Sequence, residues 1–547
     1  MTHKLRITPL GGLGEIGKNM TAIEYGDDIV IIDAGIMFPA NDMYGIDSII
    51  PDYKYLMDKL HKVKAVLITH GHEDHVGALP FVMKDIKAPI YATQLTAGLI
   101  DVKLRRAGLD KEVEVIRIDA GDKFQVGVFT IEPFHVAHSI PDCVGFGITT
   151  PVGLIVHTGD YKFDHTPTDG WPPDFAKLAE FSQRGVLCLF ADSTNADRPG
   201  WTQTEKMIEP AFDKLFREAK GRIIVASFAS LISRIQLVAN MASKYGRRLA
   251  ITGRSMRDNT KMARKLGYLD INEEMLIDIH DISNYPANKV VIMATGSQGE
   301  PTAVMGRLAR GRHNRLNVQK NDTIVFSAHA IPGNEEVVYR TINQLFRRGA
   351  NVIYEGVANV HVSGHASQEE MKLLINLIRP KFMVPIHGEL RHLKEHAEIA
   401  KKLGIPAKNI AVVENGTPLE LTEDSLTILN RMKGGYIFVD GGSVGGIGWS
   451  VVRERDQLSQ NGFFFAVVNT NGRGDVIGKP DFVSKGFVNL REAEDLLEGA
   501  EDTIARVIRQ HAENKDRKSI EKPLANALNR YFYAETGRRP LVQVNVK

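Results

Sequence analysis

The sequence predicts an α/β protein of several domains. Short apolar runs such as 65–68, 153–157 and 186–192 predict buried strands, and segments with helical character alternate with them. At 547 residues, the chain has room for roughly three or four domains of ordinary size. Histidine or aspartate ends or closely follows each of these strands, so we expect a functional site at the strand ends.

Composition narrows the possible classes of protein. The formal net charge of +2 neither requires nor excludes nucleic acid, so any surface that binds it has to be local. The only cysteines, Cys143 and Cys188, provide no disulfide framework and suit a reducing compartment. The start of the chain lacks an apolar signal core, and no run approaches the ~18 apolar residues of a membrane span. We therefore expect a cytoplasmic protein without a membrane segment.

Near the start, Gly12, Gly14 and Gly17 spell the GxGxxG pattern of dinucleotide-binding folds. Such a fold requires a helix next, but segments 20–25 and 29–32 flank a Gly-Asp-Asp turn and predict a hairpin. The glycines are therefore expected in a loop close beside a crowded site, and a nucleotide cofactor is not.

The strongest motif is ITHGHEDHVG, which follows the apolar run 65–68. Positions two apart on an extended chain point the same way, so His70 and His72 can converge on one ion. Gly71 permits a tight turn, beyond which Asp74 and His75 can face a second ion. Neutral imidazoles and carboxylates suit a divalent metal such as zinc. We predict a two-metal site.

Further candidates follow other strands. Asp33 ends the hairpin, where it is either a turn carboxylate or, as we favour, a partner that orients the metal ligands. His138, just before a Ser-Ile-Pro turn, is a better ligand candidate than His135. Asp160 follows a buried strand beside a glycine and is placed to bridge two cations, whereas Asp164 suits a simple turn or cap.

The middle of the chain predicts a parallel α/β domain, because strands ending in Gly- and Pro-containing loops alternate with helices. Helices are expected at 52–62, 234–246, 258–266 and 334–348. His387, in the segment PIHGE, lies far beyond Asp160 in the chain. A last ligand so distant indicates that one domain is inserted into another.

The order of these motifs resembles the metallo-β-lactamase superfamily: Asp33, then HGHEDH, then His138, then Asp160. That fold is an αββα sandwich with a dinuclear metal site at one edge. The segments GGLGEIGKN, ADSTNA, TGSQGEP, SAHAIPGNE, HVSGHAS and PIHGE narrow the resemblance to the β-CASP branch, and in detail to the ribonuclease J family, over essentially the whole chain. One departure is Leu231, where many relatives have a polar residue.

The resemblance implies a metallo-β-lactamase sandwich, an inserted β-CASP α/β domain and a small C-terminal α/β domain. The expected boundaries are 1–207 and 353–425 for the two parts of the first domain, 208–352 for the insertion, 426–450 for a linker and 451–547 for the C-terminal domain. In that last domain we expect a strand at 463–471 and helices at 490–514 and 520–536. The second helix carries Leu524, Leu528 and Tyr531 on one stripe. The domain would support dimerisation and help to position RNA.

The resemblance also assigns the site residues. One metal would be held by His70, His72, His138 and Asp160, and the other by Asp74, His75, Asp160 and His387. Zinc is the expected ion, with manganese or magnesium as alternatives. Asp192 would donate a proton, and His365 would accept one or stabilise the leaving group. RNA phosphates would be held by His361, Val362, Ser363, Gly364 and His365, with Ser230 opposite. His329 in a catalytic role and Asp440 at a structural cation are weaker suggestions.

The implied activity is hydrolysis of phosphodiester bonds in single-stranded RNA. We expect a 5′→3′ exonuclease that prefers 5′-monophosphate ends and also cleaves internally, acting in rRNA processing and mRNA decay. A homodimer or tetramer and membership of an RNA-degradation complex are also expected. Local basic patches fit an RNA path. They comprise Arg247, Arg248, Arg254 and Arg257, and then Arg307, Arg310, Arg312, His313 and Arg315.

Two other functions remain open. A small-molecule metallohydrolase of the same fold, such as a thioesterase or lactonase, would use the same ligands. It would have no need of the inserted domain or the HVSGHAS loop. A non-catalytic RNA-binding subunit is the other alternative, but here every expected ligand position is occupied.

Overall fold

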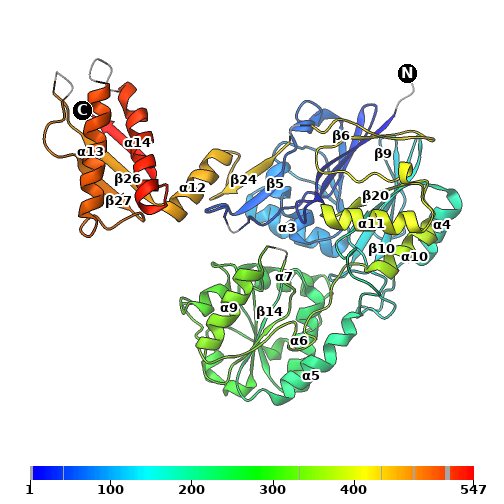
Figure 1. Ribbon diagram of the computed structural model, residues 1–547. Helices are drawn as coiled ribbons and strands as arrows, with labels where there is room; N and C mark the ends of the chain where they lie inside the picture. Colours follow the sequence, from blue (N-terminus) through cyan, green and yellow to red (C-terminus); the bar gives the residue numbers. More distant parts are fainter. Residues whose placement is uncertain (1–3, 41, 332, 433, 472–474, 512–517) are drawn as a thin grey trace. The chain divides into compact units, whose positions relative to one another are not determined.

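The computed structural model describes residues 4–40, 42–331, 333–432, 434–471, 475–511 and 518–547. The chain forms two units, Met1–Phe38 with Ser48–Ile437, and Pro39–Asp47 with Phe438–Lys547. Figure 1 colours them along the sequence. The segment Pro39–Asp47 therefore groups with the C-terminal part of the chain, which the expected domain boundaries did not include.

The first sheet of the larger unit has eight strands in the order β23-β22-β1-β3-β4-β6-β7-β8. Their bounds are β1 Leu5–Gly11, β3 Met20–Tyr25, β4 Asp28–Ile32, β6 Val63–Leu67, β7 Ile90–Ala92, β8 Val115–Arg117, β22 Leu419–Leu421 and β23 Leu426–Ile428. Strands β3 and β4 pair antiparallel across the Gly26-Asp27 turn, so the predicted hairpin is confirmed. The predicted helix 52–62 is wrong. Two short 3-10 helices, Lys54–Leu56 and Leu60–Lys62, stand there.

The second sheet has six strands in the order β20-β13-β12-β11-β10-β9. Their bounds are β9 Phe124–Val126, β10 Phe129–Val136, β11 Cys143–Thr150, β12 Gly153–His157, β13 Val186–Asp192 and β20 Phe382–Ile386. Strands β13 and β20 pair in parallel although a whole domain separates them in the chain. The insertion predicted from His387 is therefore confirmed.

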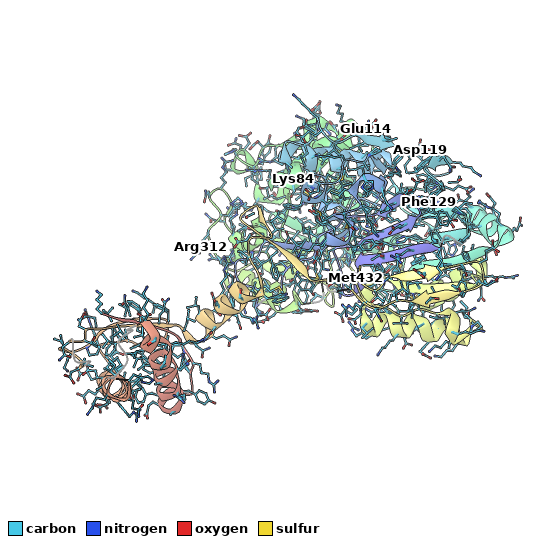
Figure 2. All side chains as sticks on the ribbon, turned by 90° about the horizontal axis from the view of Figure 1, so that it is seen from above. Lys84, Glu114, Asp119, Phe129, Arg312 and Met432 are labelled. Carbon is cyan, nitrogen blue, oxygen red and sulfur yellow. The ribbon has the colours of Figure 1, made fainter. Side chains whose placement is uncertain are left out.

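The two sheets pack face to face. Ile7 and Val30 of the first sheet belong to the same buried cluster as Phe129 and Phe190 of the second, and Phe129 is labelled in Figure 2. Helices cover the outer faces. Those over the first sheet are α1 Glu73–Val76, α2 Leu79–Val82 and α3 Gln94–Ala107, and those over the second are α4 Phe175–Arg184, α10 Gln368–Ile378 and α11 Leu390–Lys402. This is the expected αββα sandwich.

The inserted domain has a six-stranded parallel sheet in the order β16-β15-β17-β14-β18-β19. Its strands are β14 Ile223–Ala226, β15 Arg248–Ile251, β16 Leu276–Ile277, β17 Val290–Ala294, β18 Thr323–Phe326 and β19 Asn351–Ile353. Alternate residues of β14 face opposite helix layers, as the pleat requires. One layer contains α5 Glu209–Glu218, α6 Ile232–Lys244 and α7 Arg254–Lys265, and the other contains α8 Val304–Ala309 and α9 Glu335–Arg347. The predicted parallel domain is confirmed.

The smaller unit is an α/β domain. It contains α12 Trp449–Asn461, β26 Phe463–Val468, β27 Asp481–Lys485, α13 Glu494–Gln510, α14 Lys518–Thr536 and β28 Leu541–Val546. Leu524, Leu528 and Phe532 of α14 are fully buried, and Tyr531 packs half-buried against the same core. The predicted end of the preceding helix, 512–514, lies outside the described residues. Helix α12 was not predicted, because it buries only Val452.

No helix among the described residues is long and apolar enough to cross a membrane. Cys143 and Cys188 are both buried and unpaired, in agreement with the absence of a disulfide framework.

Candidate functional site

The candidate ligands come together where strands of both sheets end. His70 and His72 follow β6, His138 follows β10, Asp160 follows β12 and His387 follows β20. Within the described residues, three groups of possible metal-donor atoms share Asp160, with all atoms of a group within 4.8 Å of one another. Two of them contain the expected ligands: His70, His72, His138 and Asp160, and Asp74, His75, Asp160 and His387. The third joins Asp160 and His387 to Asp192 and His365. The geometry thus unites the sets that the sequence resemblance implied.

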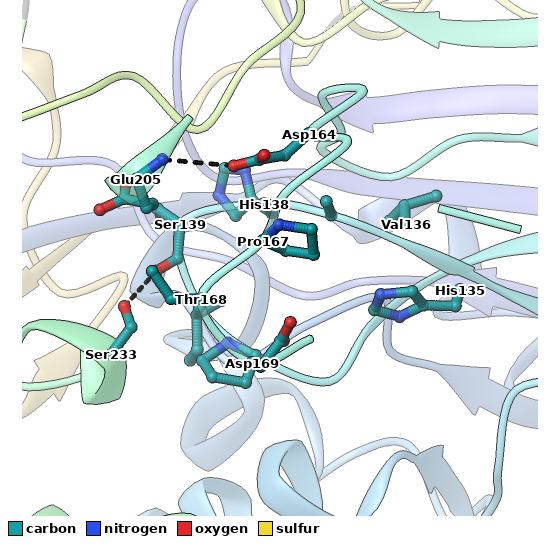
Figure 3. Close-up of a pocket in the computed structure, with 13 residues that line it drawn as sticks. His135, Val136, His138, Ser139, Asp164, Pro167, Thr168, Asp169, Glu205 and Ser233 are labelled. Atoms are coloured by element: carbon teal, nitrogen blue, oxygen red, sulfur yellow. Dashed lines mark hydrogen bonds between the residues drawn. The ribbon is translucent and has the colours of Figure 1, made fainter. Parts of the chain in front are cut away.

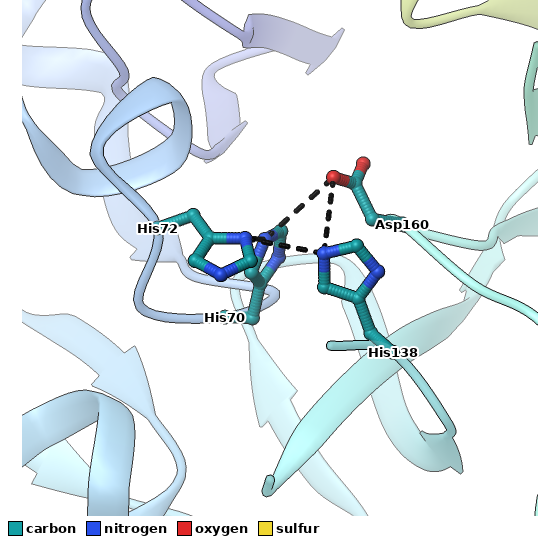
Figure 4. Close-up of side chains that lie close together, drawn as sticks. All are labelled: His70, His72, His138 and Asp160. Carbon is teal, nitrogen blue, oxygen red and sulfur yellow. Dashed lines mark hydrogen bonds and ion pairs between the residues drawn. The ribbon is translucent and has the colours of Figure 1, made fainter. Parts of the chain in front are cut away.

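In the first group three imidazole nitrogens converge (Figure 4). His72 Nδ1 lies 3.0 Å from His70 Nε2 and 3.1 Å from His138 Nε2, and Asp160 Oδ2 lies 3.6 Å from His70 Nε2. His138 Nδ1 is 2.7 Å from the carbonyl oxygen of Gly364, to which it can donate, leaving its Nε2 lone pair free toward the group.

Burial keeps these three rings neutral. It lowers the pKa of His70 and His138 well below their usual range and that of His72 to about 4, because a charged imidazole is costly away from water. Neutral imidazole is the form that binds a metal.

The second group is held around both oxygens of Asp160. Oδ2 lies 3.2 Å from His75 Nε2 and Oδ1 lies 2.8 Å from His387 Nδ1, while Asp74 Oδ2 is 3.3 Å from His387 Nε2. Although these atoms are close, Asp160 Oδ1 and His387 Nε2 are buried without an aligned hydrogen bond in the described chain. Buried polar atoms that face one another without bonding suit a cation between them. The donor set and its geometry fit a divalent metal.

Asp33 lies behind His75. Its Oδ2 is 2.8 Å from His75 Nδ1, and its Oδ1 accepts a 2.8 Å hydrogen bond from the backbone N–H of Thr69. It therefore orients a ligand and the ligand loop together. Asp33 and His387 both have left-handed backbones, with φ of 61° and 48°. Such strain persists only where the surroundings determine it.

The glycine-rich loop lies against the same cluster. Its short strand β2 Leu13–Gly14 pairs in parallel with β21 Gly388–Glu389, directly after His387. Asn19 donates a 2.9 Å backbone hydrogen bond to the carbonyl oxygen of Asp74. A Cβ at Gly35 would overlap that same oxygen, so the close approach requires glycine. The loop shapes the metal site, as expected, and supplies no nucleotide-binding helix.

A polar pair stands beside Asp160. His365 Nδ1 and Asp192 Oδ2 are 2.7 Å apart, and Asp192 Oδ1 accepts hydrogen bonds of 2.9 and 2.7 Å from the N–H and hydroxyl of Thr194. Burial favours neutral Asp192, but the charge of His365 and hydrogen bonding by His365 and His387 hold the pKa of that carboxyl below its usual range. Burial opposes the charged form of His365, yet Asp192 and Asp160 raise its pKa. Both shifts favour an ionised Asp192 and a protonated His365.

The loop 361–365 is fastened from several sides. Asn195 Nδ2 donates to Ser363 Oγ at 2.8 Å and to the carbonyl oxygen of His365 at 3.0 Å, and Thr202 Oγ1 donates to the same carbonyl at 2.6 Å. Gly364 packs against a ligand, since a Cβ there would lie 2.5 Å from His138 Cε1. Sequence reasoning missed Asn195 and Thr202. Their only local signal is their position shortly after Asp192.

The remaining candidates belong to neither metal-ligand group. Ser230 is in the loop after β14, and no side-chain bond joins it to loop 361–365 in the described structure. Leu231 beside it is buried, so it offers no side chain to a ligand. His329 lies 2.6 Å from Glu355, and Asp440 forms a 2.7 Å ion pair with Arg455 within the smaller unit. Neither arrangement tests the role suggested for the residue.

The structure places His135 in neither group of candidate metal ligands. Its ring stacks on Trp171 at 3.9 Å, and its Nε2 is 3.0 Å from the Trp171 carbonyl oxygen. His135, His138, Asp164 and Glu205 line a cavity (Figure 3) with a free volume of about 20 Å³. That is room for about one water molecule, so this cavity is no substrate pocket.

Comparison with known families covers nearly the whole chain. Residues 29–181 match the beta-lactamase superfamily domain, 220–345 the ribonuclease J beta-CASP domain, 349–410 the Zn-dependent metallo-hydrolase RNA specificity domain and 450–547 the ribonuclease J C-terminal domain. The four segments follow the order of the sandwich, the insertion, the return to the sandwich and the smaller unit.

Relatives match along their full length. Ribonuclease J 1 of Streptococcus pyogenes serotype M3 is 43% identical, covering 99% of this chain and 97% of the relative. Ribonuclease J2 of Bacillus subtilis is 38% identical, covering 99% and 98%. A crystal structure of a protein of unknown function from Enterococcus faecalis V583 aligns with a TM-score of 0.55 at 15% identity, over 76% of this chain and 100% of that one, and supports the fold alone. The chain belongs to the ribonuclease J family.

Proposed function

We propose that the protein is a metal-dependent ribonuclease that hydrolyses phosphodiester bonds in RNA. The observation that carries the proposal is a pair of metal-ligand groups sharing Asp160, with the proton-bearing Asp192–His365 pair next to that bridge. Membership of the ribonuclease J family and the match to an RNA specificity domain over 349–410 support RNA as the substrate.

We propose two zinc ions as the resident metals, with manganese or magnesium able to replace them. His70, His72 and His138 would hold one ion, Asp74, His75 and His387 the other, and Asp160 both. When bound, the ions would lower the pKa of a water molecule so that it loses a proton and can attack phosphorus. They would also offset the negative charge on the phosphoryl oxygens.

The chain's own residues would manage the proton of the leaving group. As the bond between phosphorus and the departing 3′ oxygen breaks, that oxygen needs a proton. The His365 side chain is partly exposed, whereas Asp192 is fully buried beside it, and the directions of both pKa shifts favour the proton on His365. We therefore assign proton donation to His365 and its orientation to Asp192, reversing the roles expected from the resemblance.

Loop 361–365 would hold the phosphates, with Ser230 opposite and the hydroxyl of Ser363 as a side-chain donor. A pocket for a 5′-monophosphate end would explain 5′→3′ exonuclease action, because each cleavage leaves a new 5′-phosphate on the shortened RNA. Internal cleavage would accompany it. Roles for His329 at the rim and for Asp440 at a structural cation remain subsidiary proposals.

The wider assignments are also proposals. They comprise the domain boundaries near 207, 352 and 425, a homodimer or tetramer, a partner complex for RNA degradation, and action in rRNA processing and mRNA decay. A reducing cytoplasm is supported by the two unpaired, buried cysteines. A thioesterase or lactonase activity is disfavoured, because such a substrate uses neither the inserted domain nor loop 361–365.

The test is the product pattern from one end-labelled RNA carrying either a 5′-monophosphate or a 5′-triphosphate, with and without a chelator. Mononucleotides from the monophosphate RNA alone, abolished by the chelator, would establish the exonuclease. Internal fragments from both RNAs would make it chiefly an endonuclease. Failure to cleave either RNA with metal bound would overturn the proposal in favour of a small-molecule hydrolase.

A further inference from the structure

The inserted domain has a concave basic surface that the catalytic proposal does not use. We call it the arginine pocket. It has a volume of about 520 Å³ and is lined by Ala309, Arg310, Arg312, Gln344, Arg347 and Arg348. No lining residue is acidic. Arg312 is labelled in Figure 2. The sequence shows a basic run around 310–315, but only the fold adds Arg347 and Arg348 from the end of α9.

Two of the four arginines have a structural explanation. Arg348 Nε donates a 2.7 Å hydrogen bond to the carbonyl oxygen of Ala309, the last residue of α8, and Arg310 donates to the Pro301 carbonyl oxygen. Cations are favourable at the C-terminal end of a helix, so these side chains fit their places without a ligand.

That explanation leaves out Arg312, and it covers only the charge of Arg347, which lies in the last turn of α9 without bonding a carbonyl oxygen in the described structure. Both side chains are exposed, and neither has a hydrogen bond or ion pair within the described part of the chain. They add charge beside two other guanidinium groups, although like charges repel. A surface that gathers unneutralised guanidinium groups around a hollow suits an anion with several phosphates, because guanidinium groups bind phosphate oxygens in pairs.

The arginine pocket is separate from the catalytic site. Parallel strands β14 and β18 end in the loops of Ser230 and His329, at their carboxyl edge. Helix α9 begins just beyond the His329 loop and runs back, so that Arg347 and Arg348 stand beside the start of β19 at the opposite edge. With its 13 residues, α9 alone spans about 20 Å. A short RNA held at loop 361–365 would not reach this far, but a longer one would.

We infer that the arginine pocket is a second RNA-binding site, which holds backbone phosphates of a long single-stranded substrate while its 5′ end occupies the catalytic site. The inference rests on the proposed ribonuclease function. Contacts of this kind carry no sequence information and raise the affinity for long RNA.

The test compares the double substitution R312A/R347A with wild type on 5′-monophosphorylated RNAs of about 6 and about 30 nucleotides. Binding is measured by fluorescence anisotropy in the presence of chelator, over a range of salt. For the long RNA we expect the affinity to fall about tenfold at low salt and the slope of log K against log salt to shrink by about 1.4, since each phosphate contact contributes about 0.7 on single strands. Affinity for the short RNA and its turnover with metal should not change.

Two control variants distinguish phosphate binding by Arg312 and Arg347 from a general effect of positive charge on the surface. R312K/R347K keeps the positive charges and should retain most of the affinity for long RNA. R340A removes an exposed arginine on the same helix that is already paired with Glu336, and it should have no effect.

Wild-type affinity of R312A/R347A for the long RNA would overturn the inference. So would an unchanged affinity for RNA accompanied by lost binding of polyglutamate, which would assign the pocket to an acidic protein. Because binding is measured without turnover, the arginine pocket is tested even if the protein fails to cleave RNA, and that failure would count against the proposed function alone.

Discussion

The donor cluster around Asp160 and the arginine pocket both gather side chains of one kind, but they differ in burial. His70, His75, Asp160 and His387 are at most 2% exposed. The ring nitrogens of His70, His75 and His138 that point away from the cluster are held by Thr69, Asp33 and Gly364, respectively. Arg312 and Arg347 are exposed and have no partner among the described residues.

The difference shows two ways to prepare a charged site. The buried cluster is set in place before any ligand arrives, so a single change disturbs several neighbours. The side chains of the arginine pocket are exposed and become ordered only when a ligand binds. Each of them therefore contributes a modest amount to the free energy of binding. Substitutions should therefore be costly in the first and mild in the second.

The largest effect is expected from His75→Ala. The substitution removes one ligand of the second group and the partner of Asp33, so turnover of RNA should be abolished while RNA binding persists through loop 361–365. Product release from labelled RNA and metal content per chain measure the two effects. His280→Ala, which removes an exposed histidine outside the cluster, is the control. Surviving activity in His75→Ala would refute the two-metal assignment.

The next largest effect distinguishes the members of the proton-bearing pair. His365→Ala should lower kcat by about 10² to 10⁴, the usual contribution of a general acid. Asp192→Asn should lower it less, because His365 stays in place and only its orientation and charge balance weaken. Single-turnover cleavage with metal content verified checks the order. A greater loss for Asp192→Asn would return the role of donor to Asp192.

A smaller effect is expected at Asp33. Asparagine tolerates the left-handed backbone but is a weaker acceptor from His75, so Asp33→Asn should reduce metal affinity by about 10- to 100-fold. Competition with a coloured chelator measures this. Asp142→Asn is a matched control, since Asp142 is also buried with a positive φ of 66° but lies outside both ligand groups. Equal losses in both variants would mean that backbone strain, and not orientation of His75, is responsible.

The smallest effect belongs to the arginine pocket. Arg312→Ala removes an exposed side chain without a partner, so the free energy of unfolding should change by no more than about 0.5 kcal/mol. Thermal unfolding followed by circular dichroism checks it. A clear loss of stability would show that Arg312 has a structural role and would remove the contrast with the buried cluster.

The local part of the site could be predicted from the sequence. His70 and His72 flank one glycine after an apolar strand, so their convergence follows from the two-residue period of an extended chain. The β3–β4 hairpin and the alternation of strands and helices in the inserted domain are equally local. The roles of Asp192, His365 and His387 came from family resemblance, since no local pattern singles them out.

Prediction from local sequence pattern failed where packing between distant residues determines the structure. Residues 52–62 have helical character, yet they form two single-turn 3-10 helices. Helix α12 buries too little to leave an apolar stripe, and Phe532 of α14, which was not expected in the core, is more deeply buried than Tyr531. Arg247 was expected on a basic surface but is buried, donating to the backbone oxygens of Gly221 and Ala219.

By itself, the sequence determined the class of the fold and the chemistry of the first ligand loop, because each depends on neighbours within a few residues. It also indicated an insertion, because His387 lies so far beyond Asp160 in the chain. Only the tertiary structure decided which atoms of Asp160 face His75 and His387, that Asn195 and Thr202 fasten loop 361–365, and that Arg347 and Arg348 join Arg310 and Arg312. These contacts join residues far apart in the chain. They arise when strands such as β13 and β20 pair across an inserted domain, and sequence spacing carries no record of that pairing.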